Sequence, residues 1–296
     1  MESLTASSDE AKLTHMSSIF RDSIHRLYDS GAPFFTRENI QKAGEELQRF
    51  QNGDRSEGGN VTLKGVDGGT YEYFAKPREG PVREDEHLSK WVIYYRSIEE
   101  LTSCTNLEFF DLKSAYLSLE ISSVIIIILK GLESEDSHPP APPAQDLTTI
   151  PIPFTLEKII GLRSGALVFR SQLRIRPVLH HALISTPHSI LVQHPAYTDR
   201  DRNILRSVGF TILDDPQALL DLNESCALVA ISAGLPIRDI VADLCRPGLI
   251  IWGRERSSAP WNPRVKNMIG NEYTEFSFPF HQWFRNLAIL VRKPIR

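Results

Sequence analysis

The stretch from Ile152 to Trp252 alternates short apolar runs with segments that are each long enough for one helix. Continuous runs of Val, Ile and Leu are typical of strands buried on both faces, as in a parallel sheet covered by its crossover helices. The alternation therefore predicts an α/β fold. The five expected strands are KIIGL (158–162), SILVQHP (189–195), GFTILDD (209–215), CALVAIS (226–232) and GLIIW (248–252).

Three regions are expected from changes in composition along the chain. Residues 148–296 are predicted to form a Rossmann-like parallel sheet with helices on both faces. Residues 131–147 are acidic and then rich in proline, which is typical of an exposed linker or long loop. Residues 1–130 are predicted to form an extension of helices and a β-hairpin.

The elements of this extension are indicated by local signals. Apolar residues at three- and four-residue spacing predict a helix from Asp9 to Ser30, which ends before Gly31. A second helix is expected from the N-cap Thr36 to Asn52-Gly53. The turn VDGG (66–69) predicts a hairpin. KWVIYY (90–95) and residues 115–129 are expected to be strands, with a short helix over residues 97–104 between the two.

The end of the chain has weaker signals. Residues 255–267, ERSSAPWNPRVKN, have the composition of a loop. The tail over residues 273–293 ends in a β-like run, which we expect to form an edge strand that closes the sheet.

Composition narrows the class of protein. The chain has 296 residues, of which 41% are apolar, and this is enough for a substantial core. The formal net charge of −4 argues against a polybasic nucleic-acid binder, although local patches can still matter. No DNA partner is expected. The apolar run over residues 121–129 has about half of the ~20 residues that a membrane-spanning helix needs. No secretory signal is expected at the N-terminus.

The three cysteines are odd in number and far apart. Cys104, Cys226 and Cys245 lie in or beside apolar runs. This pattern indicates buried thiols in a reducing compartment instead of a disulfide framework or a zinc site. We therefore expect a cytoplasmic protein.

The turn GLRSG follows the first predicted strand of the α/β region. Its glycines, Gly161 and Gly165, would let backbone N–H groups approach a ligand, and the start of the next helix favours anionic groups. The motif is neither G-x-G-x-x-G nor a Walker sequence. Ser164 is a candidate nucleophile if a base lies nearby, although serine in a loop is more often a cap or a turn former.

A basic and histidine-rich segment comes next. Arginine side chains suit phosphate groups, so the cluster here could meet a nucleotide or the end of an RNA, and a solvated helix face explains it equally well. His181 is a candidate acid or base, whereas adjacent histidines without a carboxylate at i+4 do not form a zinc site. The clustered arginines are Arg163, Arg170, Arg174 and Arg176.

The segment QHPAYTDRDR (193–202) places polar residues after the second predicted strand. Thr198 can cap the next helix, and Asp199 and Asp201 lie in its first turn, where negative charge suits the helix dipole, so both aspartates have a structural explanation. Tyr197 has none in the sequence, and its hydroxyl-bearing ring is a candidate substrate contact. His194 ends the same strand, and Asp214 and Asp215 end the third.

The same segments resemble a known family. The pieces QHPAYTDRDRNILRSVGFTILDDP, IVADLCRPGLIIW, KIIGLRSGAL and HHALIST are similar to the sensitivity-to-red-light-reduced (SRR-like) domain in its fungal form. LYDSGAPFFTRENI also resembles the N-terminal leader of those proteins. The chain departs from the family pattern at Arg163, in the glycine-rich turn, and at His194, where an acidic residue is usual. Without that acidic residue, an ordinary dinucleotide site is not expected.

The resemblance implies two alternative functions. Some members are regulators without assigned catalysis. Fungal proteins that look similar include the arginine-containing cyclodipeptide synthases, which join two aminoacyl groups from tRNA and need no metal or redox cofactor. For such an enzyme, we expect Ser164 as nucleophile, His181 or Tyr197 as proton carriers, and a binding set for arginyl-tRNA and a second aminoacyl-tRNA. That set consists of Gly161, Arg163, Gly165, His194, Asp199, Asp214 and Asp215 for the substrate, and Arg170, Arg174 and Arg176 for the tRNA.

Overall fold

The computed structural model describes eleven segments of the chain. They are residues 15, 18–53, 57–77, 87–103, 115–127, 156–163, 189–195, 197–231, 235–254, 262–278 and 286–294. The chain divides into two compact units, which are described separately. Unit 1 comprises Met1–Val82 and Ser89–Ile125, and unit 2 comprises Arg83–Leu88 and Ile126–Arg296. The predicted linker over residues 131–147 lies outside the described residues.

Unit 1 begins with a helix over residues 18–29, which ends before Gly31 in the left-handed region (φ 87°). The next helix, α2 (Arg37–Gln51), starts at Thr36, whose side chain accepts a hydrogen bond from the Asn39 backbone N–H at 3.2 Å. The cap satisfies a backbone donor that has no partner within the helix. Both helices agree with the sequence predictions over the described residues.

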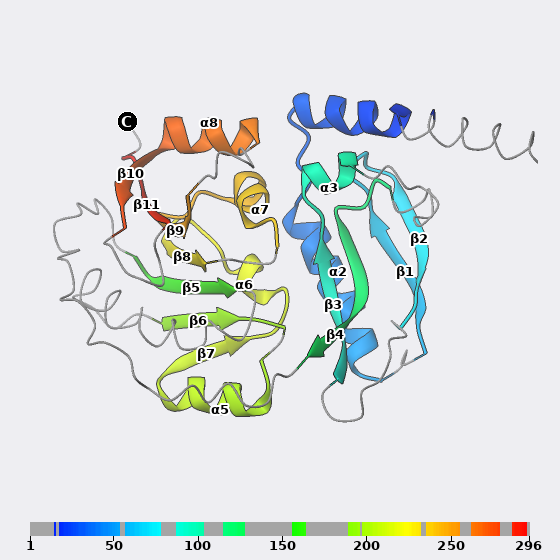
Figure 1. Cartoon of the computed structure of the whole chain (residues 1–296), viewed down its shortest axis with the longest axis horizontal. Helices are drawn as coiled ribbons and strands as arrows, with labels where there is room; N and C mark the ends of the chain where they lie inside the picture. Colours follow the sequence, from blue (N-terminus) through cyan, green and yellow to red (C-terminus); the bar gives the residue numbers. More distant parts are fainter. Residues whose placement is uncertain are drawn as a thin grey trace, which may run out of the picture. The chain divides into compact units, whose positions relative to one another are not determined.

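The strands of unit 1 form two pairs (Figure 1, cyan to green). β1 (Gly59–Lys64) and β2 (Thr70–Ala75) are the predicted antiparallel hairpin, with Gly68 in its turn at φ 82°. β3 (His87–Tyr95) pairs with β4 (Leu119–Ile127), and α3 (Ile98–Ser103) lies between them in sequence. The Tyr73 hydroxyl of β2 accepts a hydrogen bond from the Ile121 N–H of β4 at 2.5 Å, so the two strand pairs are in contact.

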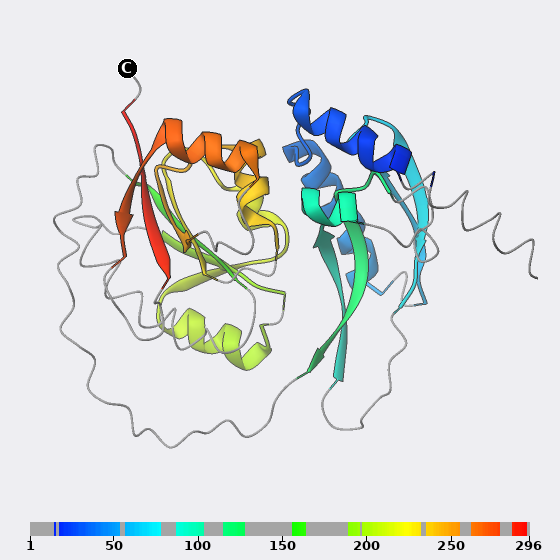
Figure 2. The ribbon, with the colours of Figure 1, turned by 45° about the horizontal axis from the view of Figure 1, so that its top comes forward.

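Unit 2 is a mixed α/β structure built on a seven-stranded sheet (Figures 1 and 2). Its strand order is β10-β11-β9-β8-β5-β6-β7. The five predicted strands are confirmed, and all five are parallel. They are β5 (Lys158–Arg163), β6 (Ser189–Gln193), β7 (Phe210–Leu213), β8 (Cys226–Ile231) and β9 (Leu249–Gly253).

The described helices of unit 2 connect or follow these strands. They are α5 (Asp199–Ser207), α6 (Gln217–Leu220), α7 (Ile237–Leu244) and α8 (Pro263–Glu272). Leu205 of α5 packs with Val192 on one face of the sheet. Arg238 of α7 lies over Trp252 of β9. Because consecutive residues of a strand point to opposite faces of the sheet, Trp252 lies on the face opposite to that of Ile251. Burial on both faces explains why these strands are continuously apolar in sequence.

The C-terminal part of unit 2 differs from two predictions. Residues 255–267 were expected to be a loop, but α8 starts at Pro263, with Asn262 as its N-cap. Asparagine followed by proline is a helix start because proline suits the first helical position. The final run was expected to be an edge strand, but β11 (Leu287–Arg292) lies inside the sheet between β9 and β10 (Tyr273–Ser277), antiparallel to both. β10 is the edge strand.

Candidate functional site

The last residues of the five parallel strands define one edge of the sheet, which we call the carboxyl edge. These residues are Arg163, Gln193, Leu213, Ile231 and Gly253. The chain runs from β5 outward to β6 and β7, and then returns to β8 on the other side of β5. In open α/β sheets, ligands bind outside the carboxyl ends at the point where the strand order reverses in this way. The carboxyl edge is therefore the candidate functional site.

The first predicted turn begins later than the sequence indicated. Gly161 lies within β5, where it is paired with Val192 of β6 and Val229 of β8. It is buried in the sheet instead of standing in a ligand-facing loop. The strand continues to Arg163, whose backbone is at the carboxyl edge. The remaining predicted residues of this region, Ser164, Gly165, Arg170, Arg174, Arg176 and His181, lie outside the described residues.

His194 and Tyr197 lie together at the end of β6. His194 is 8% exposed, and its ring centroid is 5.3 Å from that of Tyr197. The Tyr197 ring also packs against the buried cluster formed by Val192, Leu205 and Phe210. Tyr197 was expected to lack a structural role, and this expectation was wrong, because the ring helps to cover the contact between α5 and the sheet.

The start of α5 is closed by a reciprocal capping box. The Thr198 side chain accepts a hydrogen bond from the Asp201 N–H at 3.2 Å, and the Asp201 carboxylate accepts one from the Thr198 N–H at 2.9 Å. Two backbone donors are thereby satisfied, and the acidic residues suit the positive end of the helix dipole. Asp199, a predicted substrate contact, is exposed in the first turn.

Asp214 and Asp215 are adjacent in sequence but make different contacts. The side chain of Asp214 is 80% exposed and forms an ion pair at 3.1 Å with Arg202 of α5. Asp215 accepts a hydrogen bond from the side chain of Gln193, at the end of β6, at 2.9 Å. The structure therefore separates two carboxylates that the sequence treated as equivalent: one contacts a surface helix and the other contacts the neighbouring strand.

Gln193 was missed by the sequence prediction. It is only 5% exposed, and its side-chain oxygen accepts a hydrogen bond from the Ala218 N–H of α6 at 2.7 Å. Buried amides need partners for both ends. A polar residue that ends an apolar strand, SILVQ, was the available signal.

At the end of β9, the Arg238 guanidinium lies 5.8 Å from the centroid of the Trp252 ring and donates a hydrogen bond to the Gly253 carbonyl at 2.8 Å. Cation–π contact and this bond hold the start of α7 against the carboxyl edge. The neighbouring Asp239 bonds to Asn262, the N-cap of α8.

The remaining observations concern metals, thiols and membranes. Among the residues that the structure describes, no group of three His, Cys, Asp or Glu side chains could hold a metal ion. Cys226 is buried, as predicted, whereas Cys245 is only half-buried, and burial raises the pKa of the Cys226 thiol. None of the helices within the described segments has the length and apolar character needed to cross a bilayer.

Comparisons with family models, curated proteins and solved structures found no match to this chain. The resemblance to the SRR-like domain therefore rests on the sequence segments alone.

Proposed function

We propose that this protein is an SRR-like protein of the fungal form that makes an arginine-containing cyclic dipeptide from two aminoacyl-tRNAs. The observation that carries the proposal is topological. Of the segments with the resemblance, one contains β5, one begins at the last residue of β6 and contains β7, and one ends in β9, and the carboxyl ends of these strands share one edge. The order β7-β6-β5-β8-β9 reads 3-2-1-4-5 when the strands are renumbered, which supports a Rossmann-like core.

The proposed reaction depends mainly on the positions of the reactants. Aminoacyl esters are already activated, so the protein needs to bring two acyl groups together and to move protons. We expect the Ser164 hydroxyl to attack the ester carbonyl of the first aminoacyl-tRNA, which forms an acyl-enzyme, while His181 or Tyr197 carries the serine proton to the departing tRNA hydroxyl. The amine of the second aminoacyl-tRNA then attacks the serine ester, forms the first peptide bond and releases Ser164 with its proton restored. The free amine of the dipeptide finally attacks the ester of the second tRNA, which closes the ring and releases that tRNA with a proton.

The residues with proposed binding roles belong to the carboxyl ends of the parallel strands and to the segments that follow them in sequence. Arg170, Arg174 and Arg176 would contact phosphates of the tRNA acceptor ends, because guanidinium groups form paired hydrogen bonds to phosphate. The substrate groups would contact Arg163 and His194, and the backbone near Gly161 and Gly165. A carboxylate among Asp199, Asp214 and Asp215 would receive the arginine side chain. The protein would act in the cytoplasm, where charged tRNA is available.

The test is to express the chain in a bacterial host and to analyse the medium by mass spectrometry for cyclic dipeptides containing arginine. Purified protein is then incubated with arginyl-tRNA and a mixture of other aminoacyl-tRNAs. We expect a new product that is absent after ribonuclease treatment. The Ser164→Ala variant is expected to lose activity by at least about a hundredfold, and normal activity in this variant would remove the nucleophile from the proposal. Folded wild-type protein that forms no product would contradict the function.

A second candidate is a non-catalytic SRR-like regulator that binds a small ligand or a partner at the same edge. The roles of Tyr197 in packing and of Thr198 in capping favour it, because these polar residues have structural explanations. Binding of a ligand without turnover would distinguish this function from the first.

A further inference from the structure

Gln193 connects three elements at the carboxyl edge. It is the last residue of β6, opposite Leu162 of β5 and Leu213 of β7 in the register of the sheet. Its side chain reaches both the N–H of Ala218 in α6 and the carboxylate of Asp215. One buried amide therefore joins the end of β6 to the corner that follows β7.

The orientation of this amide is determined by chemistry. The Ala218 N–H can only donate, so the atom that faces it at 2.7 Å must be the side-chain oxygen Oε1. The nitrogen Nε2 then faces Asp215 Oδ1 at 2.9 Å and donates to it. Since Gln193 is 5% exposed, losing either bond would leave a buried polar group without its partner.

The contrast with Asp214 shows what the amide does. Asp214 is 80% exposed and is bound to Arg202 of α5, the helix that packs against Val192 of β6 and Phe210 of β7. Asp215 is bound to β6, which lies one strand closer to the reversal point at β5. Its carboxylate is therefore held toward the interior strands of the sheet.

We propose that Gln193 is a positioning residue that holds the Asp215 carboxylate toward the centre of the carboxyl edge, where Asp215 binds a cationic or hydrogen-bond-donating group of the substrate. This inference rests on the proposed function, and it selects Asp215 over Asp214 as the substrate-binding carboxylate. A fixed carboxylate binds such a group better than a mobile one because its orientation is already set before binding.

Three variants separate positioning from simple structural support. Gln193→Leu removes both hydrogen bonds. The double variant Gln193→Glu with Asp215→Asn exchanges amide and carboxylate, so the bond between the two positions and the acceptor for Ala218 remain while the charge leaves position 215. Gln217→Leu is the matched control, since Gln217 donates to Asp221 at 2.8 Å on the exposed side of α6.

The measurements are kcat and KM for each aminoacyl-tRNA, the thermal midpoint, and the crystal structure of each variant. We expect Gln193→Leu to lower the midpoint by roughly 5 °C and to raise KM for one aminoacyl-tRNA by roughly tenfold or more. The exchanged variant is expected to return to within about 2 °C of the wild type while its KM stays raised at least about tenfold. Gln217→Leu should match the wild type in KM.

Two results would overturn the inference. Full activity of the exchanged variant would mean that the pair is only structural and that charge at position 215 is not needed. An Asp215 side chain that keeps its wild-type rotamer in the Gln193→Leu crystal would mean that Gln193 does not position it. If the wild type forms no product, the proposed function fails, and the crystal structures still decide the positioning: a displaced Asp215 in Gln193→Leu supports it.

Discussion

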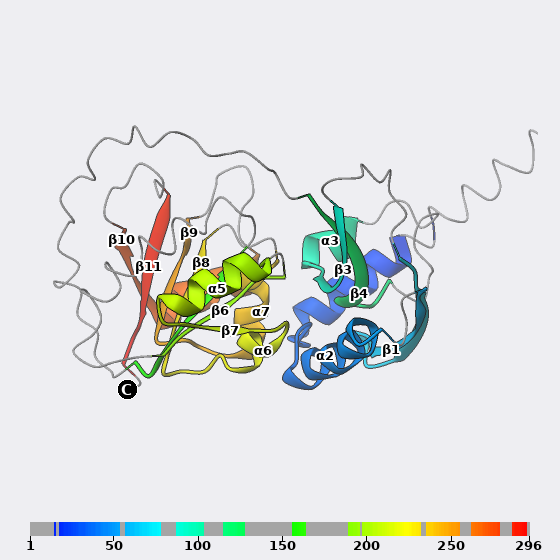
Figure 3. The ribbon, with the colours of Figure 1, turned by 90° about the horizontal axis from the view of Figure 1, so that it is seen from below.

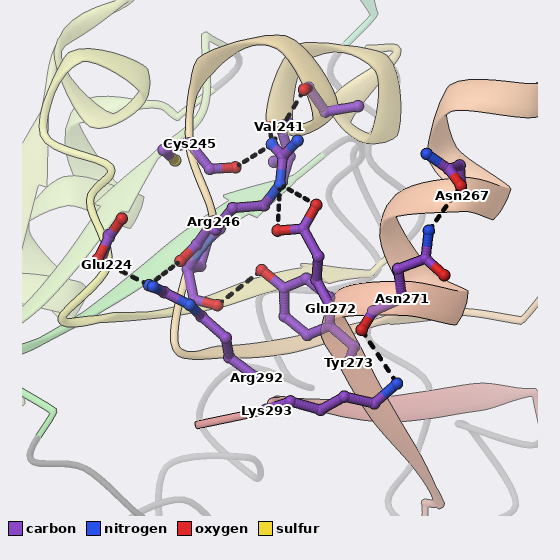
Figure 4. Close-up of polar contacts among 12 residues, drawn as sticks. Glu224, Val241, Cys245, Arg246, Asn267, Asn271, Glu272, Tyr273, Arg292 and Lys293 are labelled. Atoms are coloured by element: carbon purple, nitrogen blue, oxygen red, sulfur yellow. Dashed lines mark hydrogen bonds and ion pairs between the residues drawn. The ribbon is translucent and has the colours of Figure 1, made fainter. Parts of the chain in front are cut away.

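The polar groups at the two ends of the parallel strands make different contacts. We compare the carboxyl edge with the opposite side of the sheet, where the strands begin, which we call the amino edge. At the amino ends of β8 and β9, Arg246 donates from Nε to both oxygens of Glu272, at 2.9 and 2.8 Å, and from Nη1 to the carbonyls of Ala242 and Cys245. Figure 4 shows this guanidinium between the end of α7 and the end of α8. It supplies donors to helix carbonyls that have no partner within α7.

The same network holds the last strand of the chain. Arg292, at the end of β11, contacts Glu224 at 2.8 Å and the Arg246 carbonyl at 3.2 Å. The Tyr273 hydroxyl donates to the Pro247 carbonyl at 2.8 Å (Figure 4). These contacts join segments that are far apart in sequence, and they lie away from the carboxyl ends where a ligand is expected.

The carboxyl edge has a different character. Gln193 holds Asp215, Arg238 holds Gly253, and α5 with its capping box lies beside β6 and β7 (Figure 3). The contacts at the amino ends therefore join α7, α8 and β11, while those at the carboxyl ends fix the Asp215 carboxylate and the start of α7.

The largest loss of stability is expected from a substitution in the buried part of β11, the strand held by the amino-edge contacts. Leu290→Ala removes a fully buried side chain (0% exposed) from the centre of β11 and leaves a cavity on one face of the sheet, beside its register partner Ile250 of β9. We expect a loss of about 3 kcal/mol in the free energy of unfolding, measured by urea denaturation. Thr274→Ala, at an exposed position on β10, is the control, with an expected change below about 0.5 kcal/mol. Equal effects would contradict the position of β11 inside the sheet.

A smaller effect is expected from the amino-edge network itself. Arg246→Met keeps the apolar stem but removes the bonds to Glu272 and to the end of α7. Because the side chain is partly exposed, screening reduces the ionic part, and we expect a loss of about 2 kcal/mol. Arg254→Met, which breaks the more exposed pair with Glu275 at 3.2 Å, should cost less than about 1 kcal/mol. If the Arg254 variant were the less stable one, the assigned anchoring role would be wrong.

The amino edge should also respond to high pH. Burial raises the pKa of the Tyr273 phenol above its usual range. The folded protein therefore keeps this proton at a pH where the unfolded chain has lost it, so stability is fully present below about pH 10 and falls above it, by at most about 1.4 kcal/mol per pH unit. Urea unfolding between about pH 8 and pH 11 measures this slope. Tyr273→Phe is expected to make it shallower, and an unchanged slope would count against Tyr273 as its source.

The smallest loss of stability is expected from breaking the exposed ion pair between Asp214 and Arg202. Asp214→Asn breaks an ion pair whose carboxylate is 80% exposed and whose partner Arg202 is 19% exposed. Such pairs contribute little, so we expect less than about 0.5 kcal/mol, with the difference vanishing at high salt. The substrate KM should also stay unchanged. A large rise in KM here would transfer the substrate-binding role from Asp215 to Asp214.

Much of the local structure was predictable because its signals are local. The cap at Thr36 and the turn VDGG each act over a few residues, and the five apolar runs reflect burial on both faces. The site was predictable only in part. Placing ligands at strand ends follows from the fold class, but no local signal predicts the contacts of Gln193, because its partners Asp215 and Ala218 lie more than twenty residues away.

By itself the sequence determined the five parallel strands of unit 2 and the start of α5 at the cap Thr198. Only the tertiary structure decided the order of those strands, the insertion of β11 between β9 and β10, and the separation of Asp214 from Asp215. The physical reason is that strand order and register arise from contacts between distant segments, whose free energy depends on what packs beside them. An apolar run predicts that a strand is buried, but it does not predict which neighbouring elements bury it.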